Sequence, residues 1–362
     1  MIKYLGSKSR LVPVIGEIAA VLGGQGTALD LFTGTTRVAQ EMKRRGLFTT
    51  AVDTATYSEV FARCYIETDG AALDAGQLEE ALAHLSRLPG RAGYFTETFC
   101  VRSRFLQPFN GERVDAIREA IETDYAGTDL YPVLLTSLLE AADRVDSTTG
   151  LQMAYLKSWA PRSYKPLELR PPALLAGEGR ALRADARQIA GRLGRFDLAY
   201  LDPPYNQHRY FTNYHLWETL VRWDAPAHYG VACKRVDSRE DETKSVFNSK
   251  REMPAVLAEL IGRLDCRLLV LSYNSEAWIE RGDLEQMCSV HGFVRTLAFD
   301  SRRYVGAQIG VHNPRGERVG EVSHLHNLEY LIVAGAERDV VAATAGFAAA
   351  GAPAAPGPVP SR

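Results

Sequence analysis

The chain has 362 residues, 46% of them hydrophobic, which suits one large α/β domain or such a domain carrying a smaller inserted one. Its net charge of −2 excludes a strongly basic protein. A nucleic-acid partner is not excluded, because binding DNA or RNA requires only a local basic face.

The cysteines and the N-terminus indicate in which cellular compartment the protein is expected. The five cysteines are far apart and include no Cys-x-x-Cys pair, so the sequence indicates neither a disulfide framework nor a metal site. The N-terminus does not resemble a signal peptide, and no uncharged apolar run reaches membrane length. We therefore expect a soluble cytoplasmic protein with no membrane partner.

The first 56 residues have the pattern of a βαβ unit preceded by a short basic segment and a helix. The apolar runs at 28–32 and 49–53 are predicted strands, and residues 37–45 between them are a predicted helix. The turn after the first strand contains Gly34, which lets a ligand approach the backbone. Asp53 ends the second strand, where acidic side chains contact ribose hydroxyls in nucleotide-binding sheets.

This turn lacks the Gly-x-Gly-x-x-Gly pattern of dinucleotide sites, because Thr36 occupies the place of a second glycine. The turn therefore favours a nucleoside without phosphates over a diphosphate, and S-adenosylmethionine is such a ligand. On its own, however, the turn does not differ from an ordinary connection between a strand and a helix.

Residues 57–150 change to helical periodicity without a good strand, which predicts an inserted helical subdomain. A connector rich in proline and aromatic residues follows, and the α/β pattern resumes near residue 181. Strands are predicted at 196–201 and 267–273, a helix at 254–264 and a hairpin-like section at 294–333. The segment 337–362 is mostly alanine, glycine and proline, and we expect it to be disordered.

The strand at 196–201 ends in the most informative motif of the chain, Asp202-Pro203-Pro204-Tyr205. Two prolines continue neither a strand nor a helix, so this turn is stiff. It places a carboxylate, a prolyl carbonyl and an aromatic ring at the carboxyl end of a strand, where open α/β sheets bind ligands. The two acceptors suit the N–H groups of an exocyclic amine, and the ring suits stacking on a flat base.

The segment 207–215 follows this motif and interleaves histidine and arginine with tyrosine and phenylalanine. Such a mixture at the mouth of a site suits phosphates and unstacked bases. An ordinary helix start with a few buried aromatic residues has the same composition. Both interpretations stay open from the sequence alone.

The order of these motifs resembles the Dam-like class of adenine-N(6) DNA methyltransferases. The resemblance extends from residue 1 to about 335, and its combination of motifs is specific, whereas any one motif is not. The segments that carry it are Lys3-Tyr4-Leu5-Gly6-Ser7-Lys8, Leu29-Asp30-Leu31-Phe32-Thr33-Gly34-Thr35, Tyr200-Leu201-Asp202-Pro203-Pro204-Tyr205, 207–215, Leu271-Ser272-Tyr273-Asn274, Arg303-Tyr304-Val305-Gly306 and 322–330.

The resemblance implies a Rossmann-like, S-adenosylmethionine-dependent methyltransferase sheet with an inserted helical target-recognition subdomain. Residues 1–56 and 151–336 would form the catalytic domain, and residues 57–150 would recognise double-stranded DNA. The implied catalytic residues are Asp202, Pro203, Pro204 and Tyr205. The implied S-adenosylmethionine-binding residues are Tyr4, Lys8, Asp30, Phe32, Gly34, Asp53, Asp185 and Asp202, with Tyr4 standing where the class often has tryptophan.

The expected chemistry follows from the target. Adenine must leave the duplex stack to enter a pocket, and its amine must be held so that the nitrogen lone pair faces the methyl donor. The implied biological role is that of a solitary modifying enzyme or of the partner of a restriction endonuclease. Alternatives are the same chemistry on cytosine-N(4) or on RNA adenine, a nicotinamide-dependent oxidoreductase on a similar βαβ unit, and a DNA-binding module without activity.

Overall fold

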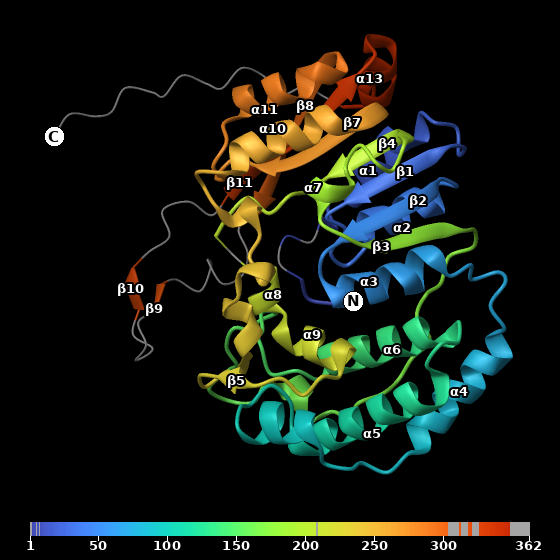
Figure 1. Ribbon diagram of the computed structural model, residues 1–362, viewed down its shortest axis with the longest axis vertical. Coiled ribbons are helices and arrows are strands. Elements are labelled where there is room, and N and C mark those ends of the chain that lie inside the picture. Colours follow the sequence, from blue (N-terminus) through green and yellow to red (C-terminus); the bar gives the residue numbers. More distant parts are fainter. Residues whose placement is uncertain are drawn as a thin grey trace.

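The computed structural model describes residues 2–4, 6, 8–207, 209–302, 311–312, 318–320 and 326–347. The largest feature of this part of the chain is a seven-stranded sheet in the order β3-β2-β1-β4-β7-β11-β8 (Figure 1). The first five strands in that order pair in parallel, and β11 runs antiparallel to both of its neighbours. The strands are β1 (Thr27–Leu31), β2 (Phe48–Asp53), β3 (Gly179–Arg183), β4 (Arg195–Leu201), β7 (Asp265–Asn274), β8 (Phe293–Arg302) and β11 (His326–Gly335).

These bounds confirm the predicted strands at 28–32, 49–53, 196–201 and 267–273, and the hairpin-like section corresponds to the β8–β11 pair. The mixed α/β class with a mostly parallel sheet is likewise confirmed. Two further two-stranded pairs consist of β5 (His228–Tyr229) with β6 (Lys234–Arg235) and β9 (Val311–His312) with β10 (Arg318–Gly320). The resembling segments 303–306 and 322–325 lie outside the described residues.

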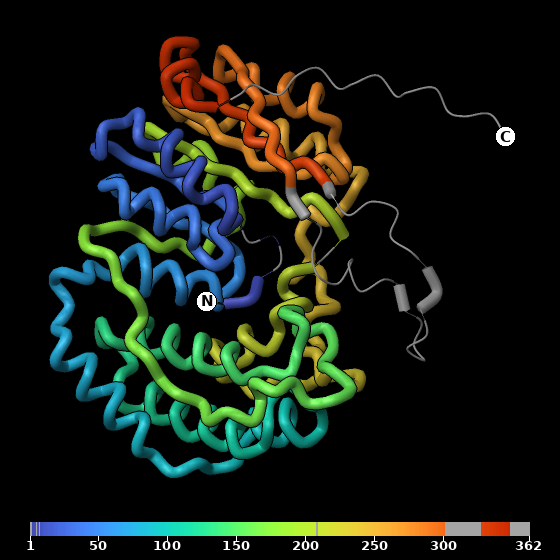
Figure 2. The backbone as a smooth tube through the Cα atoms, turned by 180° about the vertical axis from the view of Figure 1, so that it is seen from behind, coloured from blue at the N-terminus to red at the C-terminus, as the bar shows by residue number. Residues whose placement is uncertain are grey.

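Helices cover both faces of the sheet because each strand alternates its buried side chains between two cores. Leu29 and Leu31 point to one face and pack with α7, α10 and α11, whereas Ala28 faces α1, α2 and α13 on the other side (Figures 1 and 2). The helices are α1 (Val12–Ala20), α2 (Arg37–Arg44), α7 (Ala186–Ile189), α10 (Met253–Arg263), α11 (Arg281–Cys288) and α13 (Glu337–Thr344). The helices predicted at 37–45 and 254–264 are thus confirmed as α2 and α10.

Helix α13 corrects the expectation that residues 337–362 are disordered. Val340 and Ala343 are buried against the sheet, and Arg267 donates to both carboxylate oxygens of Asp339 at 2.9 Å. Spacing of three to four residues puts these side chains on one helix face, a short pattern that the alanine-rich composition obscures. Residues 348–362 lie outside the described part of the chain.

The predicted helical block forms the lower half of the molecule in Figure 1. It contains α3 (Thr56–Ala62), α4 (Ala75–Arg87), α5 (Pro108–Tyr125) and α6 (Leu130–Arg144). Helices α8 (Tyr210–Asn213) and α9 (His215–Arg222), which come after the Asp-Pro-Pro-Tyr motif in sequence, belong to the same half, because Tyr214 and Trp217 share its hydrophobic core. The helical half is therefore built from two separate stretches of chain rather than from residues 57–150 alone.

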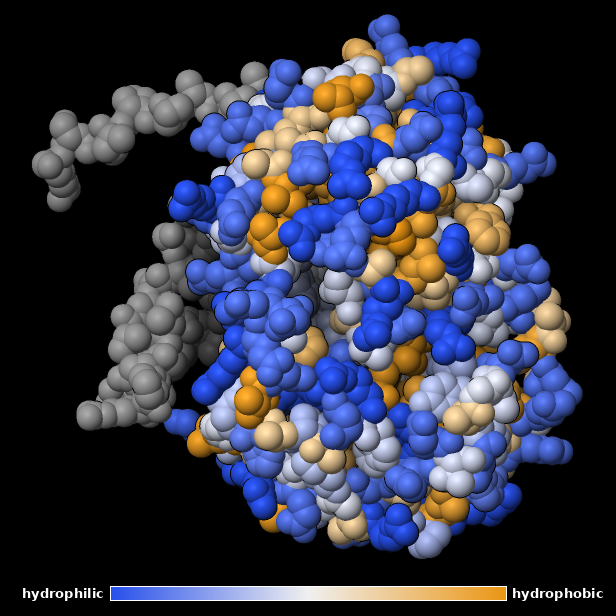
Figure 3. All heavy atoms as spheres, in the orientation of Figure 1, coloured by the Kyte–Doolittle hydropathy of each residue, from blue (hydrophilic) through white to orange (hydrophobic). Residues whose placement is uncertain are grey.

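The face of the molecule shown in Figure 3 is mainly hydrophilic, with hydrophobic side chains visible between its polar residues. Scattered exposure of this kind is ordinary for a globular protein. Among the described helices, none is both long enough and apolar enough to cross a membrane.

Candidate active site

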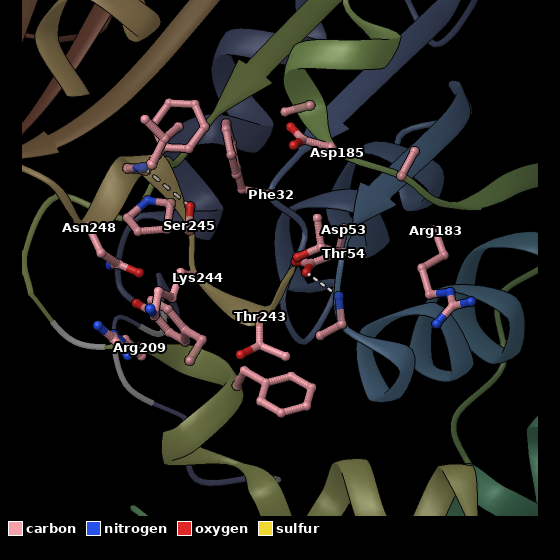
Figure 4. Close-up of a pocket in the computed structure, with 18 of the residues that line it drawn as sticks. Phe32, Asp53, Thr54, Arg183, Asp185, Arg209, Thr243, Lys244, Ser245 and Asn248 are labelled. Atoms are coloured by element: carbon pink, nitrogen blue, oxygen red, sulfur yellow. Dashed lines mark hydrogen bonds between the residues drawn. The ribbon is translucent and has the colours of Figure 1, made fainter. Parts of the chain in front are cut away.

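A cavity of about 570 Å³ lies where the sheet meets the helical half. One wall comes from the carboxyl ends of neighbouring strands: Phe32 follows β1, Asp53 ends β2, Asp185 follows β3 and Asp202 follows β4. The opposite wall comes from α8, α9 and the segment 241–248 (Figure 4). Parallel strands bring their carboxyl ends to one edge, so four distant parts of the sequence converge on this space.

Asp30 stiffens the turn that follows β1. Its Oδ2 accepts hydrogen bonds from Thr33 Oγ1 at 2.8 Å and from the amide of Ala39 at 3.0 Å. Burial raises the pKa of Asp30 to about 7, although these two hydrogen bonds oppose the shift. Its Oδ1 is buried and has no hydrogen-bond partner among the described residues. Such an orphaned acceptor suits a donor group brought by a ligand.

Gly34 connects this turn to Asp53 and to Tyr4. Its amide donates to Asp53 Oδ2 at 2.9 Å, and the amide of Ala55 donates to Asp53 Oδ1 at 3.0 Å. Gly34 has φ +53°, and a Cβ there would lie 3.0 Å from Cε1 of the Tyr4 ring. The position therefore needs glycine for both its backbone conformation and its close approach. Thr36 also adopts a left-handed conformation, with φ 62°, so the turn keeps a glycine-like shape without its second glycine.

Asp185 lies beyond β3 and caps α7 by accepting from the amide of Arg187 at 2.9 Å. Two aromatic residues from different segments pack together nearby. The rings of Phe32 and Phe247 meet edge to face, with 5.0 Å between the ring centres. Phe247 belongs to the segment 241–248, whose Lys244, Ser245 and Asn248 also line the cavity (Figure 4). This wall comes from a charge-mixed stretch, a composition that ordinarily indicates a solvated loop.

Asp202 forms an ion pair with a lysine, which also contacts a second carboxylate. Lys8 Nζ lies 3.2 Å from Asp202 Oδ1 and 3.2 Å from Glu329 Oε2. Burial raises the pKa of Asp202 to about 6, Lys8 lowers it, and Glu329 adds to the rise. Burial alone would lower the pKa of Lys8, but the charges of Asp202, Tyr205 and Glu329 outweigh it, and that pKa lies well above its ordinary value. The charge of Lys8 therefore favours the ionised form of Asp202.

Tyr4 belongs to a stack of aromatic rings. Its ring centre lies 4.7 Å from that of Tyr214 and 5.4 Å from that of Tyr210, with nearly parallel planes. Tyr4 and Tyr210 line the cavity, whereas Tyr214 and His215 are buried in the helical core. Burial lowers the pKa of His215 to about 3, which makes it a neutral core residue. Within 207–215, the described residues that reach the cavity are therefore 209–211, whereas Asn213, Tyr214 and His215 are buried and Gln207 is exposed.

The predicted site residues thus converge on one place with different degrees of access. Tyr4, Phe32, Asp53, Asp185, Asp202 and Pro204 line the cavity. The others lie in the same turns or in the N-terminal segment without lining it: Lys8, Asp30, Gly34, Pro203 and Tyr205. The ring of Tyr205 packs 5.3 Å from that of Tyr273, and Lys8 Nζ lies 5.4 Å from its centre.

A mostly parallel α/β sheet with an Asp-Pro-Pro-Tyr turn beside a glycine-containing βα turn is consistent with the fold of S-adenosylmethionine-dependent methyltransferases. Comparison with known proteins identifies the class more closely. Residues 4–287 match the D12 class N6 adenine-specific DNA methyltransferases, and the chain belongs to this family. It is thus an adenine-specific DNA methyltransferase, as the resemblance predicts.

Individual relatives agree with this assignment. The chain is 32% identical to type II methyltransferase M.NlaIII of Neisseria lactamica over 89% of its own length and 98% of that protein. It is 30% identical to modification methylase StsI of Streptococcus sanguinis, but matches only 48% of that longer protein. Type II methyltransferase M.CviAII of Paramecium bursaria Chlorella virus 1 is 28% identical over 84% of this chain.

Proposed function

We propose that the cavity binds S-adenosylmethionine next to an adenine that has left the DNA duplex. The observation that carries this proposal is the continuity of the cavity, whose lining runs from Phe32, Asp53 and Asp185 to Asp202 and Pro204. Methyl transfer requires the donor and the amine in one water-poor space, and a single cavity that joins both sets of residues meets that requirement.

The first part of the cavity suits the cofactor. Asp53 accepts from two backbone amides, yet each carboxylate oxygen has two lone pairs and keeps capacity for ribose hydroxyls. Phe32 and Phe247 offer apolar surface to an adenine ring, and Asp30 holds the turn after β1 through its hydrogen bonds with Thr33 and Ala39. We assign these residues, with Tyr4, Gly34, Lys8 and Asp185 around them, to binding or supporting S-adenosylmethionine, which supplies the methyl group.

The Asp-Pro-Pro-Tyr turn beside the cavity suits the target base. We propose that Asp202 and the carbonyl of Pro203 accept the two N–H groups of the adenine amine, which orients the nitrogen lone pair toward the methyl group. Tyr205 would stack on the base, which is worth roughly 1–3 kcal/mol and offsets part of the cost of extruding it. As the nitrogen–carbon bond forms, the sulfur–methyl bond of the donor would break and S-adenosylhomocysteine would leave. The nitrogen would become positively charged, the adjacent carboxylate would stabilise that charge, and one N–H proton would then be lost to Asp202 or to water.

We further propose that the helical half recognises double-stranded DNA, because it faces the sheet across the cavity and brings Arg209 and Arg222 to the cavity lining, which Lys244 of the segment 241–248 also joins. The relatives named as type II methyltransferases support a restriction–modification role, in which a cognate endonuclease cleaves the unmodified sequence.

Gly34→Ala is expected to weaken S-adenosylmethionine binding about tenfold, which corresponds to roughly 1.4 kcal/mol. The new Cβ would press on Tyr4 at 3.0 Å in a backbone conformation that L-residues disfavour, so the turn must shift. Isothermal titration calorimetry with the cofactor measures the effect. The matched control is Gly262→Ala, since a Cβ at that position meets no neighbour within 4 Å. Equal affinities for the two variants would argue against a cofactor at this turn.

Base extrusion predicts tighter binding to DNA in which the target adenine is mispaired. A mismatch removes part of the unpairing cost of a few kcal/mol, so the dissociation constant should fall about tenfold or more. Once sequencing of modified DNA has located the target site, fluorescence anisotropy with paired and mispaired duplexes makes the comparison. A mismatch placed outside the site is the control, and equal affinity for all three duplexes would contradict extrusion.

A further inference from the structure

Glu329 lies beside the catalytic motif although it comes from the far end of the chain. It occupies β11 directly opposite Asn274 of β7, because these two residues pair in the antiparallel register. Asn274 Nδ2 donates to Glu329 Oε1 at 2.7 Å, and Lys8 Nζ donates to Glu329 Oε2 at 3.2 Å. Asn274 Oδ1 in turn accepts from the amide of Glu276 at 2.9 Å, which fixes the amide orientation. Both carboxylate oxygens of Glu329 are therefore held by partners from different segments.

The lysine between the two carboxylates is nearly inaccessible. The side chain of Lys8 is 7% exposed, that of Glu329 15% and that of Asp202 19%. Lys8 Nζ lies at the same distance, 3.2 Å, from one oxygen of each carboxylate. An ammonium group has three N–H donors but lacks the rigid, forked geometry of a guanidinium group, so its position depends on the acceptors around it. With only Asp202 as an acceptor, Lys8 would settle between both oxygens of that carboxylate.

We propose that Glu329 is a positioning residue for methyl transfer: it draws the Lys8 ammonium to one side, so that Lys8 meets Oδ1 of Asp202 and leaves Oδ2 for the adenine amine. The inference rests on the proposed role of Asp202 as the acceptor for that amine. Glu329 itself does not touch the reacting atoms. It acts through Lys8, and Asn274 keeps its carboxylate in place.

The electrostatic consequence can be measured. The groups that act on Asp202 are Lys8 from the N-terminal segment and Glu329 from β11, which respectively lower and raise its pKa. Asp30 after β1, Tyr200 of β4, Tyr205 of the motif and Tyr210 of α8 also interact with Asp202, and each of them is present in both the wild type and a Glu329 variant. Removing the charge of Glu329 therefore lowers the pKa of Asp202, and activity should persist to lower pH.

The experiment compares steady-state methylation by the wild type, Glu329→Gln and Glu329→Asp across pH 5 to 9. We expect Glu329→Gln to lower kcat up to about 100-fold, because Lys8 would then contact both oxygens of Asp202 and compete with the adenine amine for Oδ2, with little change in KM for DNA or S-adenosylmethionine. The acid limb of its kcat profile should move to lower pH. Glu329→Asp keeps the charge and should recover part of kcat with the wild-type acid limb. Glu259→Gln, on the exposed surface of α10, is the matched control.

The outcomes separate this inference from the proposed function. A Glu329→Gln enzyme with wild-type kcat and an unmoved acid limb overturns the positioning role. If Glu329→Gln does not fold, the test rests on the Glu329→Asp variant. A reduced kcat with an unchanged acid limb of the kcat profile supports the positioning role, and an acid limb moved to lower pH contradicts it. Asp202→Asn is measured alongside. Full activity of that variant would refute the proposed role of Asp202 itself, whereas an inactive Asp202→Asn beside a normal Glu329→Gln refutes only the inference about Glu329.

Discussion

Replacing Asp202 with asparagine is expected to slow methyl transfer roughly 100- to 1,000-fold, the loss that follows removal of one preorganised charge-stabilising group. The affinity for S-adenosylmethionine should change little, because asparagine keeps the size of the side chain and the cofactor contacts proposed above are made by other residues. Single-turnover transfer of tritiated methyl groups to unmodified DNA measures the rate without interference from product release.

The size of this effect follows from the neighbour of Asp202. Lys8 Nζ lies 3.2 Å from Asp202 Oδ1 and offers only donors, so an asparagine would turn its carbonyl oxygen toward Lys8. Its NH₂ group would then face the adenine amine, and two donors would oppose each other. The variant therefore loses the negative charge and also reverses the polarity at the atom that must accept a hydrogen.

Asp265→Asn is the control for this prediction, because Asp265 is 66% exposed at the start of β7 and distant in sequence from the motif. Its rate should stay within about twofold of the wild type, as is usual for an exposed surface substitution. If the Asp202→Asn enzyme kept more than about a tenth of the wild-type rate, the carboxylate would not be the main acceptor, and the chemistry would need another group.

The site illustrates which features local sequence can predict. The turns that contain Gly34 and Asp202 are encoded by adjacent residues, and a strand followed by glycine or by two prolines fixes where the chain must turn. Since the carboxyl ends of parallel strands lie at one edge of the sheet, these turns had to lie near each other. Asp202 lines the cavity, and so does Phe32 from the turn that contains Gly34.

The missing parts of the site depend on contacts between distant segments. Glu329 lies within reach of Lys8 because of the register of β11 against β7. The sequence of a strand does not show which of its residues lies opposite a given residue of the neighbouring strand. Phe247 lies in a segment whose charges indicate a solvated loop, yet its ring packs against Phe32. No local pattern encodes either contact.

The position of residues 210–222 likewise depends on distant contacts. These residues follow the Asp-Pro-Pro-Tyr motif, and sequence order alone places them with the sheet. Instead, Tyr214 and Trp217 lie in the core of the helical half, and Tyr4 stacks on both. Helix α9 therefore links the helices to the cavity, because its other face carries Glu218 and Arg222 into the cavity wall.

Arg118→Met is expected to lower the free energy of unfolding by about 3 kcal/mol, since loss of a partner for a buried polar group costs roughly 1–3 kcal/mol each time. Arg118 lies on α5, is 1% exposed, and donates from Nε to the carbonyl of Leu220 at 2.8 Å and from Nη2 to that of Val221 at 2.9 Å. These carbonyls belong to the last turn of α9, where the helix has no further N–H groups to donate to them.

Methionine fills a similar volume but donates nothing, so both carbonyls would lose the partner that Arg118 provides. Urea denaturation followed by circular dichroism measures the change, with Arg63→Met as the control. Arg63 is 43% exposed and pairs with Glu67 on the surface, so its loss should cost at most about 1 kcal/mol. Equal midpoints for the two variants would show that α9 does not depend on Arg118. A selective loss would instead mean that a residue of the helical half holds in place the helix that walls the cavity.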